Sequence, residues 1–142
     1  MNRRLVSAVN DNDMNEVERL LSSGASPDAY DHDGKCPVLV TACDNGFSSI
    51  VQVLLKKGSN VNKTDDLGNT ALMVAVQRGD VSLIAMLLSA KADVNLKNTC
   101  GWTAQDLAKD SNHSTVISLL RSRCDINKAN VRLVDVNLNH YL

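Results

Sequence analysis

Aromatic residues are scarce in this 142-residue sequence, where Phe, Trp and Tyr together make up only 3%. Apolar residues nevertheless account for 44%, which is enough to build a core in a chain of one-domain length. That core must consist mainly of Leu, Val, Ile, Ala and Met. This composition suits thin layers of short helices better than a broad sandwich of sheets.

The sequence also lacks an excess charge and a long apolar run. Its formal net charge is −1, which gives no general attraction to nucleic acid or to an anionic membrane. No apolar stretch approaches the roughly 20 residues that span a bilayer. Arg3 and Arg4 precede only a few apolar residues before Asp11, which is too short for a secretory signal. We therefore expect no nucleic-acid partner, no membrane association and no cleaved leader.

Metal-binding patterns are missing as well. There is no Cys-x-x-Cys motif or Cys/His cluster, and the histidines lie far apart, at His32, His113 and His140. We expect no metal and no cofactor. The cysteines, Cys36, Cys43, Cys100 and Cys124, are enough for two disulfides by number alone. Reduced thiols in an intracellular protein, cytoplasmic or nuclear, are the favoured interpretation because a chain of this size needs no cross-links.

What the sequence does contain is a repeat. A Leu-Leu pair recurs at nearly equal intervals, each time with a β-branched residue three positions before it. The pairs are Leu20-Leu21, Leu54-Leu55, Leu87-Leu88 and Leu119-Leu120, and the β-branched residues are Val17, Val51, Ile84 and Val116. Each interval is one position shorter than the one before it. A period of about 33 residues indicates a small unit copied along the chain and stacked on its neighbours.

The third copy shows most clearly how a unit is built. Gly68 permits a tight turn with positive φ, and Thr70 is placed to cap a short helix that follows. Gly79 ends that helix, and Asp80 is placed to cap a longer one. Each unit is therefore predicted to be a turn, a short helix, a tight loop and a longer helix.

These residues resemble the ankyrin repeat family. The match is best over Gly68 to Asn95, where Gly-x-Thr-Ala-Leu-x-x-Ala is followed by Ile-x-x-Leu-Leu and Ala-Asp-Val-Asn. The resemblance implies an all-α fold, an ankyrin-repeat solenoid of helix-turn-helix units joined by β-hairpin-like turns. It implies a repeat domain over residues 1–128, in units of about 1–29, 30–63, 64–96 and 97–128. Residues 129–142 are expected to be a C-terminal half-repeat cap or a tail.

The copies depart from the family pattern at three places. The first unit lacks the Gly-x-Thr turn and should begin at its first helix, as a cap does. The second has one extra residue near Cys36-Pro37, so its first helix is expected to start late or irregularly. The fourth has one residue fewer between Ala108 and Leu119, and Asn112 stands where glycine is usual.

The resemblance also implies where a partner would bind, because the hairpin tips and first helices of this family line a concave surface. The predicted partner-binding residues are Asp11, His32, Asp33, Lys35, Asp44, Asn45, Asp66, Leu67, Asn69, Gln77, Arg78, Trp102 and Asp110. Asn10, Thr99, Cys100 and Ser111 lie in the same columns. Acids outnumber bases in this set, which favours a basic or mixed-charge protein or peptide, although Asp is also common in turns and caps.

Trp102, the single Trp, falls on a tip. It is either a binding anchor or a shield between the fourth unit and its neighbour. Asn62, Asn95 and Asn127 each follow Val or Ile and lie eight positions after a Leu. Asparagines in this setting resemble targets of an asparaginyl hydroxylase in animal ankyrin proteins, or else they close the repeat by hydrogen bonding.

No nucleophile elbow or activated cysteine is present, so we expect no catalysis and no catalytic residue. The predicted function is a protein–protein interaction module, an adaptor or scaffold that is monomeric when free. Two alternatives remain open. One is an ankyrin-type inhibitor or regulator of an enzyme such as a protein kinase. The other is an ankyrin module of a larger protein or of a microbial effector.

Overall fold

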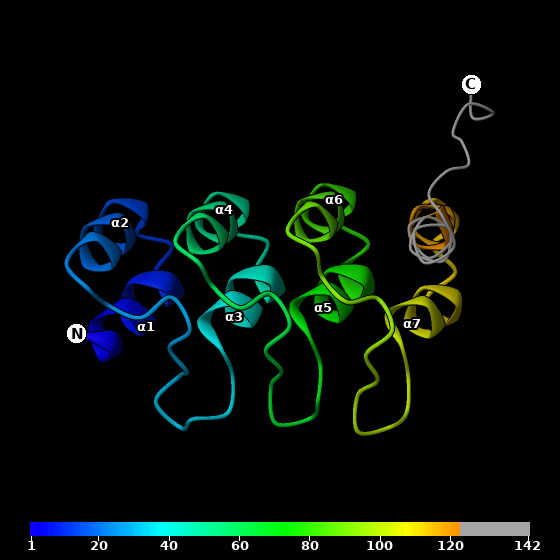
Figure 1. Cartoon of the computed structure of the whole chain (residues 1–142), viewed down its shortest axis with the longest axis horizontal. Coiled ribbons are helices and arrows are strands. Elements are labelled where there is room, and N and C mark those ends of the chain that lie inside the picture. Colours follow the sequence, from blue (N-terminus) through cyan, green and yellow to red (C-terminus); the bar gives the residue numbers. More distant parts are fainter. Residues whose placement is uncertain (123–142) are drawn as a thin grey trace, which may run out of the picture.

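The computed structural model describes residues 1–122, which form an array of paired helices (Figure 1). The first helices of the pairs are α1 (Asn2–Asn10), α3 (Val38–Asp44), α5 (Ala71–Arg78) and α7 (Ala104–Asp110). The second helices are α2 (Met14–Ser22), α4 (Ser48–Lys56), α6 (Val81–Ser89) and a helix over residues 114–122. Within residues 1–122 there is no strand, and the predicted all-α helix-turn-helix solenoid is confirmed. Residues 129–142, predicted to be a cap or tail, lie outside the described residues.

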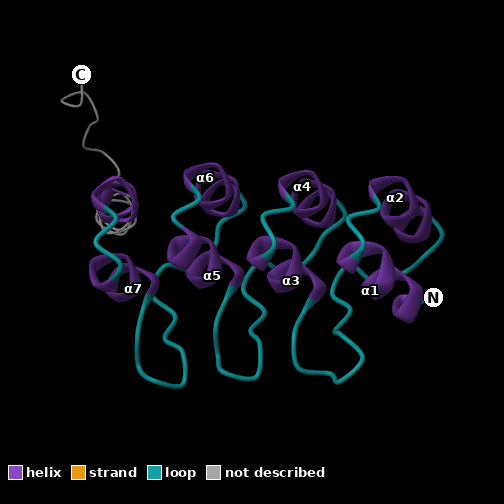
Figure 2. Cartoon of the chain, turned by 180° about the vertical axis from the view of Figure 1, so that it is seen from behind, coloured by secondary structure: helices purple, strands orange, loops and turns teal. Residues whose placement is uncertain are grey.

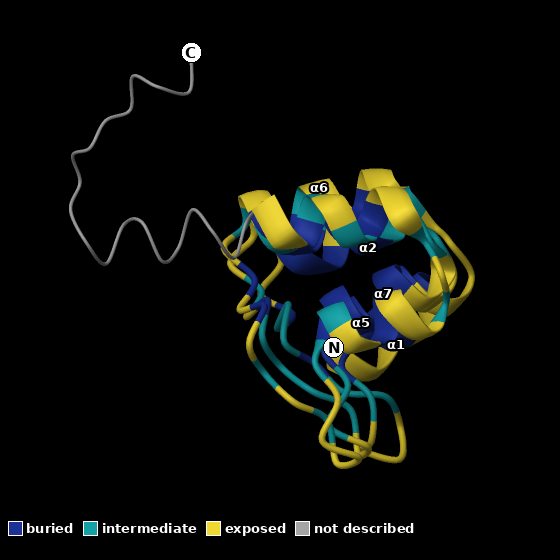
Figure 3. Ribbon diagram, turned by 90° about the vertical axis from the view of Figure 1, so that its right-hand side faces the viewer, coloured by how far each residue is buried: buried dark blue, intermediate teal, exposed yellow. Residues whose placement is uncertain are grey.

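The helices form two layers, with the first helices in one and the second helices in the other (Figures 1 and 2). Each helix packs mainly on its partner in the pair and on the corresponding helix of the adjacent pair. The core lies between the layers, and its largest fully buried side chains are almost all aliphatic, as the composition predicts. The stripe Leu83, Ile84, Leu87 and Leu88 of α6 is typical. Loops extend from the first-helix layer to one side and give the array an L-shaped cross-section (Figure 3).

The local signals predicted for the third copy are confirmed. The Thr70 hydroxyl accepts a hydrogen bond from the backbone N–H of Met73, at 3.2 Å, and Asp80 accepts one from Leu83, also at 3.2 Å. Gly79 ends α5 in the left-handed conformation with φ +70°. Asn112 adopts the same conformation, with φ +58°, so it replaces the usual glycine as expected.

The structure corrects the predicted register of the fourth copy. The last described helix begins at residue 114 and α6 begins at residue 81, the same interval that separates the starts of α7 and α5. Counted from the start of its helix, Leu120 occupies the place of Leu87 and is likewise fully buried, whereas Leu119 is only partly buried. The predicted deletion of one residue between Ala108 and Leu119 was therefore wrong. The error arose because Leu119 and Leu120 form the same dipeptide as the earlier pairs but lie one helical position earlier.

The extra residue of the second copy lies in the loop before α3. This helix starts at Val38, four positions after Gly34, whereas α5 starts at Ala71, three positions after Gly68. The late start is thus confirmed relative to the turn glycine. Val38 nevertheless precedes Leu54 by the same distance as Ala71 precedes Leu87, so the loop absorbs the insertion and the packing register is kept. Pro37 occupies the cap position and provides no capping side chain.

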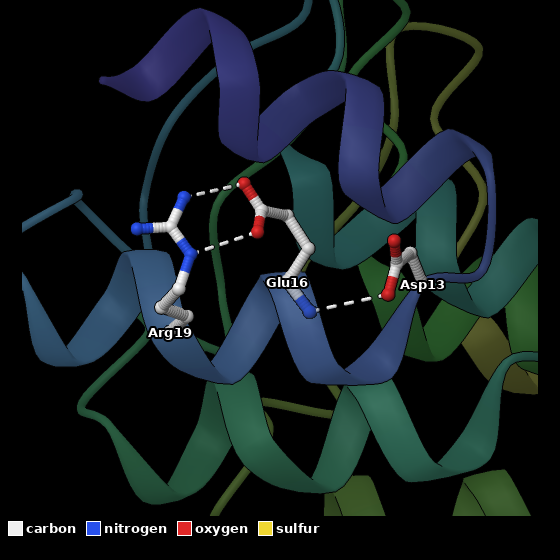
Figure 4. Close-up of polar contacts among 3 residues, drawn as sticks. All are labelled: Asp13, Glu16 and Arg19. Carbon is white, nitrogen blue, oxygen red and sulfur yellow. Dashed lines mark hydrogen bonds and ion pairs between the residues drawn. The ribbon is translucent and has the colours of Figure 1, made fainter.

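The first pair begins directly at its first helix, as predicted for an opening unit. In α2, Asp13 caps the backbone N–H of Glu16 (Figure 4). The Glu16 carboxylate accepts two hydrogen bonds from Arg19, at 2.9 and 2.7 Å, and this pairing lowers the pKa of Glu16. Because the pair is exposed to solvent, it orders two polar side chains on the surface but adds little to the stability of the fold.

His113 is the position before the last described helix that corresponds to Asp80 and Asp13. We expect His113→Asp to stabilise the fold by about 0.5–1 kcal/mol. The new carboxylate would accept hydrogen bonds from the unpaired N–H groups of the first turn, and its negative charge would be attracted to the positive end of the helix dipole. Thermal unfolding at neutral pH measures the effect, with His113→Ala as the control. A His113→Asp protein no more stable than His113→Ala would show that this helix start does not resemble those of α2 and α6.

Candidate functional site

The loops that precede α3, α5 and α7 form three neighbouring tips, here named tip 1 (residues 30–37), tip 2 (64–70) and tip 3 (97–103). The tips lie side by side along the array (Figure 1). Isolated antiparallel bridges join Tyr30 to Pro37 in tip 1 and Thr64 to Thr70 in tip 2. These bridges give tips 1 and 2 a hairpin-like form without regular strands.

Backbone hydrogen bonds connect the tips in series. The Asp66 N–H of tip 2 donates to the Lys35 carbonyl of tip 1, at 2.9 Å. The Thr99 N–H of tip 3 donates to the Leu67 carbonyl of tip 2, at 3.0 Å, and the Thr99 hydroxyl donates to the same carbonyl, also at 3.0 Å. The three loops therefore hold one another in place before any partner arrives.

Each tip is also closed internally by one side chain. Asp31, Asp65 and Asn98 occupy the same position in successive tips, and a side-chain oxygen of each accepts backbone N–H bonds from its own loop. The Lys35 N–H, at 2.8 Å from the carboxylate, is the main cause of the lowered pKa of Asp31. Sequence reasoning missed these residues, although they recur at the period of the repeat.

The predicted partner-binding side chains all lie on the tips or at the carboxyl ends of the first helices. All of them are exposed except Asn69, which is half-buried. Asn69 accepts a hydrogen bond from the Asn98 side chain of the next tip, at 3.0 Å. The structure thus brings the tip residues together on one rigid frame.

Arg78 differs from the rest of the set because it has a structural contact. Its guanidinium donates to the backbone carbonyl of Asp44, at 2.8 Å, and so satisfies a carbonyl at the end of α3. It also covers Gly46, where a Cβ would lie 2.6 Å from the Arg78 Nη2. Arg78 therefore connects two units, a role that its position in the sequence did not indicate.

The acidic residues among the predicted partner-binding residues have no contact of this kind. The ion pair between Glu16 and Arg19 is the one found within residues 1–122, so the predicted binding acids form none in that part of the chain. These acids are Asp11, Asp33, Asp44, Asp66 and Asp110, and all of them are exposed. Their charges are available to a ligand.

Two large apolar side chains are exposed on the tips. Leu67 in tip 2 is 58% exposed and Trp102 in tip 3 is 39% exposed. Their backbones are fixed, because Leu67 is bonded to Asp65 and Thr99, and the Trp102 N–H donates to Asn98 Oδ1 at 3.1 Å. Rigid backbones that present apolar side chains to solvent are typical of binding anchors.

The candidate modification sites lie in the loops that follow the second helices. Asn62 accepts a hydrogen bond from the Asp93 N–H of the next unit, at 2.8 Å, and Asp93 in turn accepts from the Asn95 N–H, at 2.9 Å. This favours a closing role for Asn62, whereas Asn95 is exposed. Hydroxylation of either residue stays a prediction, and Asn127 lies outside the described residues.

The described thiols differ in exposure. Cys100 is exposed on tip 3, Cys36 is half-buried beside the Thr41 hydroxyl, and Cys43 is buried in α3. Burial raises the pKa of Cys43 to about 12 and also raises the pKa of Cys36. Within residues 1–122, no three His, Cys, Asp or Glu side chains are grouped as a metal site would need.

This difference predicts an order of alkylation. With iodoacetamide at neutral pH, we expect that among the three described thiols Cys100 reacts first, Cys36 more slowly and Cys43 only after unfolding, because the thiolate is the reactive species. Peptide mapping by mass spectrometry after timed quenching measures each rate. Labelling of Cys43 as fast as that of Cys100 in the folded protein would contradict the packing of α3.

The repeated helix pairs and the series of tips agree with a comparison to known families. The ankyrin repeats (3 copies) model matches residues 5–98 and 39–130, which together cover most of the sequence. The chain belongs to the ankyrin repeat family. Ankyrin repeats are generally protein–protein interaction modules and are typically non-catalytic.

The ankyrin chain is also similar to a curated plant protein. It is 38% identical over 71 residues to the potassium channel AKT2/3 of Arabidopsis thaliana. The match covers 50% of this chain and 9% of the channel, so the chain spans a small part of that relative's length. None of the helices within residues 1–122 combines the length and the apolar character that a membrane crossing requires.

Proposed function

We propose that this ankyrin chain is a non-catalytic adaptor or scaffold. It binds a partner protein or peptide, of basic or mixed charge, through the surface formed by the tips and the carboxyl ends of the first helices. The observation that carries the proposal is the series of hydrogen bonds from tip 1 to tip 3 beneath exposed Leu67 and Trp102. Because the backbone is already ordered, docking costs little conformational entropy.

Charge supports the same surface. The unpaired carboxylates of Asp33 and Asp66 lie on tips 1 and 2, and Asp44 ends a first helix. Arg78, which is bonded to the Asp44 carbonyl, keeps its positive charge and balances only part of this negative charge. A surface with this field attracts a basic segment and accelerates its association at low salt.

Affinity capture from cell lysate tests the proposal. The bait is the full chain, compared with an Asp33/Asp66/Trp102→Ala variant and with a control, Glu18/Gln52/Lys56→Ala, whose exposed side chains lie on α2 and α4. Thermal unfolding first establishes that the three proteins are equally stable. We expect partners to bind the parent and the control but not the tip variant. Partners retained by the tip variant and lost from the control would place binding on the second-helix layer instead.

The similarity to the channel favours one alternative, that this sequence acts as an ankyrin module within a larger protein. An enzyme inhibitor is a further alternative from the regulatory class. Kinase assays with and without the full chain distinguish the inhibitor from the adaptor. Inhibition that the tip variant abolishes would favour the inhibitor.

A further inference from the structure

The first helix pair, α1 and α2, forms the N-terminal end of the array (Figure 1). Arg4 precedes the start of α2 by ten residues, and Glu16 is the third residue of α2. The residues at these two positions of the later units are buried, namely Val38, Ala71, Ala104, Ile50, Leu83 and Val116. Arg4 is exposed, and the Glu16 side chain is 30% exposed. These positions therefore face the preceding unit in the later copies and face outward in the first.

Charged side chains replace the apolar ones on this outward surface, here named the end face. They line an open cavity of about 360 Å³, to which Arg3, Arg4, Asp11, Asp13 and Glu16 contribute. Arg19 belongs to the same surface, because its guanidinium is bonded to the Glu16 carboxylate (Figure 4). Three bases and three acids thus balance one another on the end face. Glu18 lies on another side of α2, because its equivalents Gln52 and Ala85 are exposed as well.

The two signs of charge are separated along the end face. Arg3 and Arg4 lie in the first turn of α1, whereas Asp11 follows its last residue. Because α2 runs back beside α1 after a short loop, its start lies near the end of α1. Figure 4 shows Asp13 and Arg19 at opposite ends of one row, with Glu16 between them. One end of the surface is therefore basic and the other end is acidic.

This order of charges is unfavourable for α1 itself. The dipole of a helix favours acids near its start and bases near its end, whereas α1 has two arginines in its first turn and Asp11 at its end. A cap that only had to face water would be more stable with the reverse order. The pair between Glu16 and Arg19 is the one ion pair within residues 1–122, so Arg4 and Asp11 form none in that part of the chain. Their arrangement suits a surface with the opposite order of charges.

We infer that the end face binds the end face of a second copy of this chain, with the two α1 helices antiparallel across a two-fold axis. The rotation places Arg4 of each copy opposite Asp11 of the other, so the same charge contact forms twice. Ser7 and Ala8 lie between these charges, where small side chains permit a short distance between the helix axes. The formal net charge of −1 gives little repulsion between copies.

The inference revises the expectation that the free chain is monomeric. It goes beyond the proposed function, because the contact involves no partner protein. Since α1 meets α1, the tips of both copies lie on the same side of the dimer. If the tips bind a partner as proposed, the dimer presents two such surfaces side by side.

Sedimentation velocity of the full chain, at several protein concentrations, tests the inference. We expect a dimer that forms with rising concentration at low salt and dissociates at about 1 M salt, where surface charges are screened. Arg4→Glu and Asp11→Lys should each weaken the dimer by about tenfold or more, because like charges then meet at two places. Both changes agree with the dipole of α1, so thermal unfolding should occur at no lower temperature than in the parent.

Matched controls make the same changes of charge outside the end face. Lys56→Glu on α4 and Glu18→Lys on α2 alter exposed side chains and should leave the dimer unchanged. An equimolar mixture of Arg4→Glu and Asp11→Lys should regain the dimer, because each altered residue then meets an opposite charge on the other copy.

Three outcomes would overturn the inference. They are a parent that stays monomeric at both salt concentrations, reversed variants that dimerise as well as the parent, and a mixture of the two variants that stays monomeric. None of them affects the proposed function, since a monomer whose captured partners depend on the tips is still an adaptor. Loss of those partners from the Asp33/Asp66/Trp102→Ala variant is measured separately.

Discussion

Leu87→Ala is expected to lower the free energy of unfolding by about 2–5 kcal/mol, a large part of the stability of a domain this size. Leu87 is fully buried in α6, among side chains of the same unit such as Leu83 and Ile84. Removing its side chain leaves a cavity between the layers that aliphatic neighbours fill only in part. Because α6 belongs to a unit with neighbours on both sides, the loss affects two interfaces.

Urea unfolding followed by circular dichroism measures this change. Leu67→Ala is the matched control, since the same atoms are removed from a side chain that is 58% exposed, and it should alter stability by no more than about 0.5 kcal/mol. Equal losses in the two variants would mean that Leu87 does not lie in the core.

Gly68→Ala is expected to be the most damaging single change on the tips. The residue has φ +77°, which disfavours any side chain, and its new Cβ would lie 2.9 Å from the Thr99 nitrogen and 3.0 Å from the Asn98 Cα. These are backbone atoms of tip 3, so the two tips must separate. We expect a loss of about 2–4 kcal/mol, combining backbone strain with the loss of hydrogen bonds between the tips.

Gly34→Ala isolates the contact between the tips. Gly34 has nearly the same backbone, with φ +69°, but a Cβ there would meet nothing within 4 Å. It should therefore cost only the strain, about 1–2 kcal/mol. Chemical denaturation of both variants gives the difference between their free energies of unfolding. The binding of a captured partner should also weaken more with Gly68→Ala than with Gly34→Ala. Indistinguishable variants would argue against a direct contact between tips 2 and 3.

The helix pairs could be predicted from the sequence because each depends on local signals. Thr70, Gly79 and Asp80 act within one turn of their own position, so composition and spacing are sufficient to place α5 and α6. The fourth copy could not be aligned in this way. Leu119 and Leu120 are chemically identical, and only packing against the neighbouring unit decides that Leu120 takes the buried position.

The candidate surface was predictable in outline and not in its contacts. Which residues lie on the tips follows from their distance to Gly68 and its counterparts. That Arg78 donates to Asp44, and that Thr99 holds Leu67, depends on how residues one repeat apart in the sequence meet after stacking. Its position at the end of a first helix made Arg78 a predicted ligand contact, whereas its hydrogen bond to the Asp44 carbonyl makes it a connection between units.

The even spacing of the first helices has a consequence for how such a protein changes in length. Because α3, α5 and α7 begin at 38, 71 and 104, an in-frame duplication of residues 71–103 would create a new layer in register with the array, in which only the contact between the two copies is new. Such an addition would extend the row of tips by one without requiring a new core. The reach of the surface along a ligand is therefore set by the number of copies, while the composition of each tip sets what it contacts.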